Sequence, residues 1–494
     1  MSKVHIEIRS GAYRDSVSLL EVSRAVSLTP GVQDAIVAMG TPLNVDLLRE
    51  LGFTLDNPNP NDLIIAIRAD DDAAVSAGLA ALADEFVLID KRARSAGGGG
   101  EIAPARSVGR AYGSDLALIS VPGSGAFAEA MDALEAGQSV MIFSDNVALW
   151  QEIALKERAA KSDLLVMGPD CGTAVIGGVG LGFSNVVRPG PVGIIAASGT
   201  GAQHVLSLLD LAGVGITHCI GVGGRDLSKD VLARSTLSAL DALAEDEQTK
   251  VIVLISKPAA LEVAELVKAR AEKIGKPVVY ALLGEGSPDL TQATEQILAT
   301  LDVVKPTWPS WGVLPTNVLS TNGEGRFLRA LYSGGTICDE AMVIAAGELG
   351  DIYSNIPLRK EWSIDPFAKS KEHTFIDFGE DAMTVGRAHP MIDSTLRIER
   401  LRKEIADPAC GVILMDVVLG HGADPDPAAA LAPVIREAIS KRAIPIIISL
   451  IGSSGDPQGL ENQARSLSQA GAYVTSSNAA AVRTAISQIK SSEA

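Results

Sequence analysis

Cysteine, aromatic residues and positive charge are scarce in this chain, and each shortage argues against a class of protein. The four cysteines among 494 residues form no CxxC pair, which argues against a disulfide framework or a cysteine metal site and fits a reducing compartment. We expect all four to fill the core: Cys171, Cys219, Cys338 and Cys410. A net charge of −18 argues against a nucleic-acid or anionic membrane surface, although backbone N–H groups can still bind a small anion.

Long apolar runs are also missing. No stretch reaches the roughly 18 apolar residues that a membrane span needs, and the opening "MSKVHIEIRSG" lacks the apolar stretch of a signal peptide. We therefore predict a cytoplasmic protein that binds neither membrane nor nucleic acid.

Small apolar residues and glycine are abundant. Apolar residues make up 47 % of the chain, with 48 glycines and only 4 % aromatic residues, a composition typical of α/β folds. The length indicates about three or four domains. Strand and helix patterns alternate through residues 1–90, which predicts a small N-terminal α/β domain. Residues 91–113, with four consecutive glycines and a basic cluster, predict a linker whose arginines are a solvated tether or, alternatively, contact a phosphate.

The remaining chain repeats a strand–helix rhythm in three blocks, 114–190, 191–305 and 321–494. Buried apolar strands separated by helices predict parallel sheets covered on both faces. The last two blocks match in order: "AASGTGAQ" with "LYSGGTICDE", "THCIGVGGRD" with "TFIDFGEDAM", "KVIVLISKP" with "GVILMDVVLG", and "KPVVYALLG" with "IPIIISLIG". Four matches in register predict two structurally equivalent domains, the second with an insertion around 350–371.

The turn Ser198–Gly201 connects an apolar strand to a helix. The first turn of a helix has N–H groups without partners and a partial positive charge, and glycine lets a ligand approach the backbone. Such a turn suits a phosphate or carboxylate, although a plain capped turn gives the same pattern. Similar turns follow other predicted strands, so we expect two helix N-termini to face one crevice. The candidate binding residues are Ser198, Gly199, Thr200, Gly201, Gly223, Gly224, Ser333, Gly334, Gly335, Thr336, Gly379, Arg387, Gly420, Gly422 and Ala423.

Three side chains are candidates for chemistry beside these turns. Arg225 would neutralise bound charge, unless it merely pairs with Asp226 or Asp381. His389 and His421 lie in predicted loops and are the candidates for proton transfer, although an ordinary hydrogen-bonding role is open for both. No GxxxxGK[ST] motif and no HExxH spacing occurs, so we expect neither a P-loop nucleotide site nor a metal site.

Several motifs resemble the succinyl-CoA synthetase superfamily. "VPGSGAFAEAMDALEAG" followed by "GPDCGT" resembles the CoA-binding Rossmann domain of the α subunit, and "VGIIAASGTGAQ" its ligase domain, whereas "GVILMDVVLGHGADPDP" resembles the ligase domain of the β subunit. Over nearly the full length, "DSVSLLEVSRAV", "GPDCGTAVIGG", "GGRDLS" and "VGRAHPMID" resemble the FdrA family of acyl-CoA synthetase-like proteins, which includes AllF-like members.

The resemblance implies a multidomain α/β protein. A Rossmann-like CoA-binding-type domain (114–190) would be followed by two flavodoxin-like ligase domains with parallel sheets, of α-subunit type (191–305) and β-subunit type (321–494). If CoA binds, its candidate residues are Pro122, Gly123, Ser144, Asp145, Asn146, Pro169, Asp170 and Cys171.

The departures from the synthetases bear on function. Residues 281–294, "ALLGEGSPDLTQAT", match the region of the phosphorylated histidine but contain none, and nothing resembles the nucleotide-binding module or the glycine turn that opens the CoA domain. Some FdrA relatives are implicated as one subunit of an oxamate carbamoyltransferase, which needs phosphate but no nucleotide. We therefore expect a carbamoyltransferase subunit that works with other subunits, requires no cofactor, and binds phosphate or carbamoyl phosphate at Ser198–Gly201 and Gly420–Ala423. The alternatives are an NDP-forming acyl-CoA synthetase subunit with a nucleotide-binding partner, and a regulatory or scaffold subunit that senses an anion.

Overall fold

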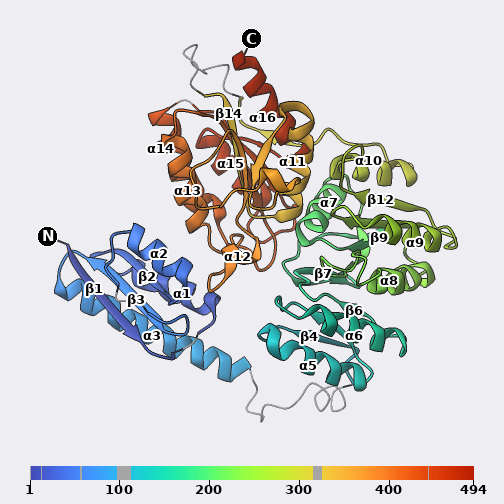
Figure 1. Ribbon diagram of the computed structural model, residues 1–494, viewed down its shortest axis with the longest axis horizontal. Helices are drawn as coiled ribbons and strands as arrows, with labels where there is room; N and C mark the ends of the chain where they lie inside the picture. Colours follow the sequence, from blue (N-terminus) through green and yellow to red (C-terminus); the bar gives the residue numbers. More distant parts are fainter. Residues whose placement is uncertain are drawn as a thin grey trace. The chain divides into compact units, whose positions relative to one another are not determined.

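The computed structural model describes residues 2–12, 14–55, 58–96, 113–314, 325–442 and 444–493. The chain divides into two compact units (Figure 1). Unit 1 comprises Met1–Ile102 and Phe378–Asp393, and unit 2 comprises Ala103–Asp377 and Ser394–Ala494. Among the described residues, no helix combines the length and the apolar character that crossing a membrane requires.

Unit 1 is built on an antiparallel sheet in the order β1-β3-β2, formed by β1 (Lys3–Arg9), β2 (Val32–Met39) and β3 (Leu63–Ala69). Helix α1 (Ser16–Ser27) begins at Asp15, which caps it, and α2 (Pro42–Glu50) begins after Thr41 with proline in its first turn. The small N-terminal α/β domain is thus present.

Helix α3 (Asp72–Ala96) extends beyond the expected end of this domain. It continues six residues into the stretch predicted as a linker, because no glycine or proline interrupts Lys91–Ala96. The rest of that predicted linker, 97–112, lies outside the described residues.

Unit 2 contains a three-stranded parallel sheet, β4-β5-β6, formed by β4 (Leu116–Ile119), β5 (Ser139–Ile142) and β6 (Val166–Met167). Helices α5 (Gly123–Glu135) and α6 (Leu149–Ala160) connect these strands, as expected for a Rossmann-like unit. Buried alanines on α5 allow close packing against the sheet.

The next sheet has the order β12-β11-β9-β10-β7-β8. Strands β9 (Pro189–Ala196), β10 (Ile216–Gly221), β11 (Val251–Ser256) and β12 (Val278–Leu282) are parallel, with α7 (Gly199–Leu211), α8 (Arg234–Glu245) and α9 (Leu261–Ala271) between them and α10 (Leu290–Thr300) after β12. Strands β7 (Thr173–Ile176) and β8 (Val179–Gly182) extend this sheet antiparallel, with Val175 opposite Cys219. The sequence assigned β7 and β8 to the preceding domain. This assignment was wrong because the pairing of β7 with β10 decides which sheet they join, and that pairing leaves no signal in the sequence.

The last sheet has the order β13-β19-β18-β17-β14-β16-β15. Its strands are β13 (Ser310–Trp311), β14 (Phe327–Tyr332), β15 (Ile352–Ser354), β16 (His373–Asp377), β17 (Cys410–Val418), β18 (Ile446–Ile451) and β19 (Tyr473–Thr475). The expected insertion supplies β15 and the short 3₁₀ helix η1 (Lys360–Trp362).

Helices pack around this sheet in two groups. Helix α11 (Gly335–Leu349) packs on α16 (Asn478–Glu493), and α14 (Pro427–Lys441) contacts both α13 (Thr395–Ala406) and α15 (Leu460–Gln469) (Figure 1). The order β18-β17-β14-β16 repeats β12-β11-β9-β10, and α7 and α11 follow the equivalent strands β9 and β14. The predicted duplication of the two ligase-like domains is confirmed.

Candidate functional site

The N-termini of α7 and α11 meet in unit 2. The hydroxyl of Ser198, which precedes α7, donates a 2.7 Å hydrogen bond to Oγ1 of Thr336 in the first turn of α11. A Cβ atom on Gly334, the N-cap of α11, would lie only 2.7 Å from Cγ2 of Thr200. Two homologous helices therefore place their N-terminal ends against each other.

Both ends retain N–H donors and hydroxyls. In α7, Ser198 Oγ accepts from Gly201 N, while Gly199 and Thr200 lie in the first turn, where a helix offers no internal acceptor for N–H groups. In α11, Gly335 and Thr336 occupy the same positions. We call these four first-turn residues, Gly199, Thr200, Gly335 and Thr336, the helix-tip site. Its partial positive charge and donors suit a small oxyanion.

Carboxylates also lie at the α11 end of the site. Asp416 of β17 accepts hydrogen bonds from the N–H and the hydroxyl of Ser333 and from the N–H of Gly334. Arg397 donates to the same carboxylate over 2.9 Å, forming a buried ion pair. The sequence predicted Ser333 and Gly334 as ligand donors, but the N–H groups of both are already occupied, because Asp416 anchors the turn.

Lys257 lies at the helix-tip site and was missed from the sequence. It directly follows β11, and its ammonium forms a 2.8 Å ion pair with Asp339 of α11. A Cβ atom on Gly335 would lie 3.5 Å from Lys257 Nζ and 2.7 Å from Oδ2 of Asp377. Burial opposes the charge on Lys257, but Asp339 and Asp377 outweigh that effect and raise the pKa of Lys257 above its ordinary value. Its side chain is 47 % exposed, so the ammonium can also reach an incoming anion.

A buried polar network fixes the two helices farther from their tips. Glu340 of α11 accepts from the N–H of Leu290, the first residue of α10, over 2.6 Å and from Nδ2 of Asn478 over 2.6 Å. Asn478 Oδ1 accepts from the Tyr332 hydroxyl, and its N–H donates to Nε2 of His204 in α7. Burial lowers the pKa of His204 to about 4, so this imidazole is neutral near pH 7.

Glu340 is expected to make stability depend on pH. Burial raises the pKa of Glu340 to about 7 from 4.5, because the charged carboxylate loses solvent and two hydrogen bonds compensate only in part. The stabilising contribution of the protonated form is full below pH 4.5 and is lost as the pH rises through 7, about 3 kcal/mol in all. The free energy of unfolding of the wild type minus that of Glu340→Gln should therefore fall as the pH rises across this range. Denaturant titration measures both values. Glu348→Gln, at an exposed position of the same helix, is the control, and parallel profiles for wild type and Glu340→Gln would contradict the prediction.

Residues 420–423 are held by contacts with Ser184 and Gln458. Gly420 packs on Ser184, with its N–H bonded to Gln458, and the N–H of His421 donates to Ser184 O. The helix that follows, α14, has its N-terminus occupied by Asp426 and Gln463, which accept from Ala429 N and Ala428 N. The structure brings Ser333–Thr336 to the α7 tip, because α11 follows the strand equivalent to β9. The predicted role of Gly420–Ala423 stays a prediction.

The side chain of Arg225 bonds to α6 and to the loop that precedes it. Its guanidinium bonds Glu152 and the carbonyl of Val147, and Glu152 in turn pairs with the buried Lys156. The predicted pairing with Asp226 or Asp381 was wrong, since Glu152 of α6 takes that role. Gly223 has φ +86° and packs on Pro169 O, whereas a Cβ on Gly224 would meet nothing. The predicted binding roles of Arg225, Gly223 and Gly224 stay predictions.

Gly379, Arg387 and His389 belong to unit 1. Arg387 contacts Asn44 Oδ1 and the carboxylate of Asp393, and Nδ1 of His389 accepts from Met391 N. Their predicted roles in binding and proton transfer stay predictions.

The predicted CoA residues gather at the carboxyl ends of β4, β5 and β6. Ser144 Oγ donates to Val121 O, Asp170 N donates to Ser144 O, and Gly123 lies so close to Asp145 O that a Cβ would be 2.1 Å away. The exposed side chains of these loops include Asp145, Asn146 and Asp170. The predicted binding of CoA at these loops stays a prediction.

The cysteines are buried, as expected. Burial raises the pKa of Cys171 to about 12, so this thiol is no nucleophile near neutral pH.

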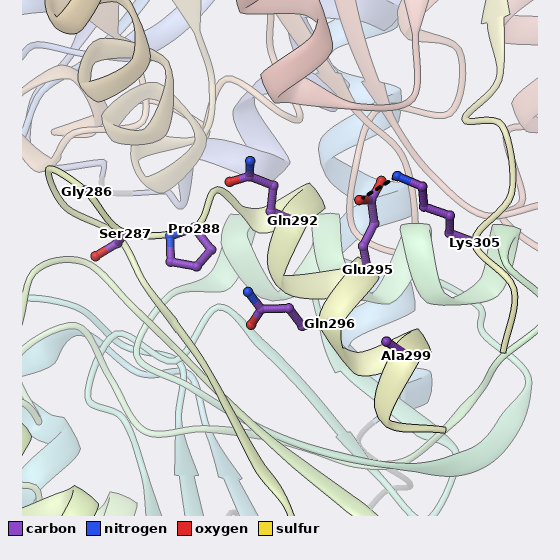
Figure 2. A pocket seen from close by; sticks show the side chains of 8 residues that line it. All are labelled: Gly286, Ser287, Pro288, Gln292, Glu295, Gln296, Ala299 and Lys305. Atoms are coloured by element: carbon purple, nitrogen blue, oxygen red, sulfur yellow. Dashed lines mark hydrogen bonds and ion pairs between the residues drawn. The ribbon is translucent and has the colours of Figure 1, made fainter. Parts of the chain in front are cut away.

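A separate hollow lies along α10. It measures about 590 Å³ and runs from Gly286–Pro288 along α10, where Glu295 pairs with Lys305 (Figure 2). Its start lies within residues 281–294, the region that lacks the synthetase histidine. Glutamines and this neutralised lysine line it, so it offers no anion site comparable to the helix tips.

Comparison with family models identifies three regions of the chain. Residues 331–487 match the "CoA-ligase" model, 187–276 the "CoA binding domain" model and 1–104 the model "AllF, heavy metal-associated domain". The CoA-binding match therefore covers β9 to α9 and not the block 114–190. A heavy metal does not fit the N-terminal domain: residues 1–104 contain no cysteine, and no cluster of three metal-ligating side chains occurs among the described residues.

Individual relatives span the chain to different extents. YahF of Escherichia coli, described as uncharacterized, is 38 % identical over 96 % of both chains. Succinate–CoA ligase subunit alpha 1 of Archaeoglobus fulgidus is 26 % identical, covering 35 % of this chain and 60 % of its own length. Among solved structures, PH0766 of Pyrococcus horikoshii covers 77 % of this chain and 84 % of its own at 17 % identity and a TM-score of 0.28. The dinucleotide-forming acetyl-coenzyme A synthetase 1 of Korarchaeum cryptofilum covers 77 % and 85 %, also at 17 % identity and a TM-score of 0.28.

Proposed function

Because the chain belongs to the family of YahF, an FdrA- and AllF-like branch of the succinyl-CoA synthetase superfamily, we propose that it forms or cleaves an acyl phosphate at the helix-tip site. The observation that carries the proposal is the meeting of the α7 and α11 N-termini, joined by the Ser198–Thr336 hydrogen bond. Phosphate would lie at Gly199, Thr200, Gly335 and Thr336, with Lys257 neutralising its charge.

We propose carbamoyl as the acyl group. A phosphate oxygen attacks the carbamoyl carbon of an N-carbamoyl amide such as oxalurate, and the bond from that carbon to the amide nitrogen breaks. The nitrogen takes up a proton, which gives oxamate, and carbamoyl phosphate is the second product. Helix N-termini and the Lys257 ammonium stabilise the phosphate and the developing oxyanion, and the fixed geometry holds the two reactants in line.

The absence of a histidine from residues 281–294 favours this reaction over nucleotide-driven ligation. Residues 281–294 contain no histidine, and His204, on α7, is fully buried. A reaction that uses inorganic phosphate directly needs neither a phosphorylated side chain nor a nucleotide.

An acid–thiol ligase subunit is the second candidate. The "CoA-ligase" and "CoA binding domain" matches favour it, and an acyl phosphate at the same helix-tip site would then pass its acyl group to the CoA thiol. This reaction requires a partner that binds nucleotide, because nothing in the sequence resembles such a module.

One set of assays tests both candidates. The full chain, alone and in the assembly purified from its native source, is incubated with oxalurate and phosphate, or with ATP, CoA and a carboxylic acid. Phosphate-dependent release of carbamoyl phosphate is the expected result. Formation of acyl-CoA, together with transfer of a phosphate label from ATP to the protein, would select the ligase. No turnover of either kind in the assembly would contradict acyl-phosphate chemistry.

A further inference from the structure

The chain leaves unit 2 after Asp377 and returns to it at Ser394, and the intervening segment Phe378–Asp393 is part of unit 1. This segment contains α12 (Asp381–Thr384), and the side chains of Met383 and Met391 are buried. The connection between strand β16 and helix α13 is therefore part of the N-terminal domain.

Asn44 holds this segment. Its Nδ2 donates to Gly386 O over 3.0 Å and to Met39 O over 2.9 Å, and its Oδ1 accepts from Arg387. The side chain is almost fully buried, at 3 % exposure. Both ends of one amide group thus bind the segment, and the bond to β2 fixes the amide in place.

Gly386 makes this contact possible. Its φ of +72° favours glycine, and a Cβ atom would lie 2.5 Å from Cγ2 of Thr41, the N-cap of α2. The segment therefore reaches Asn44 only because the backbone at this position carries no side chain.

At each end of the segment, the chain continues to a residue that lies beside the helix-tip site or helps to hold it in place. Asp377, the last residue before it, has its carboxylate beside Gly335. After it, α13 carries Arg397, which pairs with Asp416, and Asp416 holds the N–H groups of Ser333 and Gly334. The covalent chain thus connects the Asn44 contact to both acidic groups at the α11 tip.

We infer that Asn44 and Gly386 are positioning residues for the helix-tip site: the N-terminal domain holds Phe378–Asp393 so that Asp377 and Arg397 keep their places. This gives the N-terminal domain a task that requires no metal. The kinetic consequence rests on the proposed function, but the structural coupling does not.

Hydrogen exchange on the full chain tests the coupling from both sides of the contact. Asn44→Ala removes the amide, and Gly386→Ala forces the segment off Thr41 without changing the sequence of α2. Both should speed exchange of the Ser333 and Gly334 amides by about tenfold. Asn59→Ala, at an exposed asparagine of the same domain, is the control and should leave these amides unchanged.

The kinetic readout separates positioning from folding. Both variants should raise KM for phosphate by about tenfold with a smaller change in kcat, whereas simple loss of folded protein lowers kcat alone. Faster exchange confined to unit 1 would overturn the inference. Faster exchange at Ser333 and Gly334 without phosphate-dependent turnover in the wild type would support the coupling and remove the proposed function.

Discussion

Lys257→Met is expected to lower kcat/KM for phosphate by about 10²- to 10³-fold. The ammonium lies beside Gly335 at the N-terminus of α11, and Asp339 and Asp377 surround it. Without it, phosphate would meet these carboxylates with only N–H and hydroxyl donors to offset the repulsion. Removal of one well-placed donor to a developing oxyanion has an effect of this size in other enzymes.

Two substitutions make the Lys257 experiment specific. Lys257→Arg keeps the charge but changes its geometry, so we expect a partial loss. Lys250→Met removes an exposed lysine of the same domain, whose ammonium bonds only the nearby carbonyl of Glu247 in the structure as described. An unchanged kcat/KM in Lys257→Met, measured by initial rates at varied phosphate, would remove Lys257 from the site.

Gly334→Val is the substitution with the second large expected effect. The backbone at Gly334, φ −116° and ψ 113°, accepts valine, so the consequence is steric alone. Its Cβ would lie 2.7 Å from Thr200 Cγ2 and 2.8 Å from Thr200 Cβ, which forces the two helix tips apart. A displacement of about 1 Å lowers turnover roughly 10²-fold, and overpacking reduces the free energy of unfolding by about 1–3 kcal/mol.

Gly347→Ala is the matched control for Gly334→Val. Gly347 lies on the same helix, and a Cβ atom added there would meet nothing within 4 Å, so alanine should stabilise α11 by about 0.5–1 kcal/mol and leave turnover unchanged. Activity assays and thermal unfolding of both variants check the pair. Full turnover in Gly334→Val would mean that the separation of the tips is irrelevant to the reaction.

The fold was predictable because its signals are local. Alternating apolar strands and helices gave the domain order, and four matching strand ends in each half predicted the duplication that the repeated order β12-β11-β9-β10 and β18-β17-β14-β16 confirms. The assignment of β7 and β8 failed for the opposite reason. Antiparallel pairing with the edge of β10 is a long-range choice that leaves no periodic signal in residues 173–182.

The site was only half predictable. The sequence marked Ser198–Gly201 and Ser333–Thr336 as helix-start turns, but it could not tell which of several such turns meet. The predicted role of Gly420–Ala423 stays a prediction. Lys257 escaped notice because "LISKP" reads as the end of a strand. Its position is informative in retrospect, since it directly follows the strand that lies beside β9, which precedes α7.

Charge at the helix tips is more balanced than the turn sequences implied. Asp377 and Asp416 accompany the α11 tip, and Lys257 and Arg397 compensate them. The first-turn N–H groups therefore sit among paired charges, an arrangement that can hold a phosphate without leaving an uncompensated charge when the site is empty.

A crystal structure of the full chain soaked with phosphate tests the central claim most directly. The account predicts tetrahedral density between α7 and α11, within hydrogen-bonding distance of first-turn N–H groups at Thr200 or Gly335 and of Lys257 Nζ. Density at the start of α14 or at the β4–β6 loops, with none between the two helix tips, would contradict it.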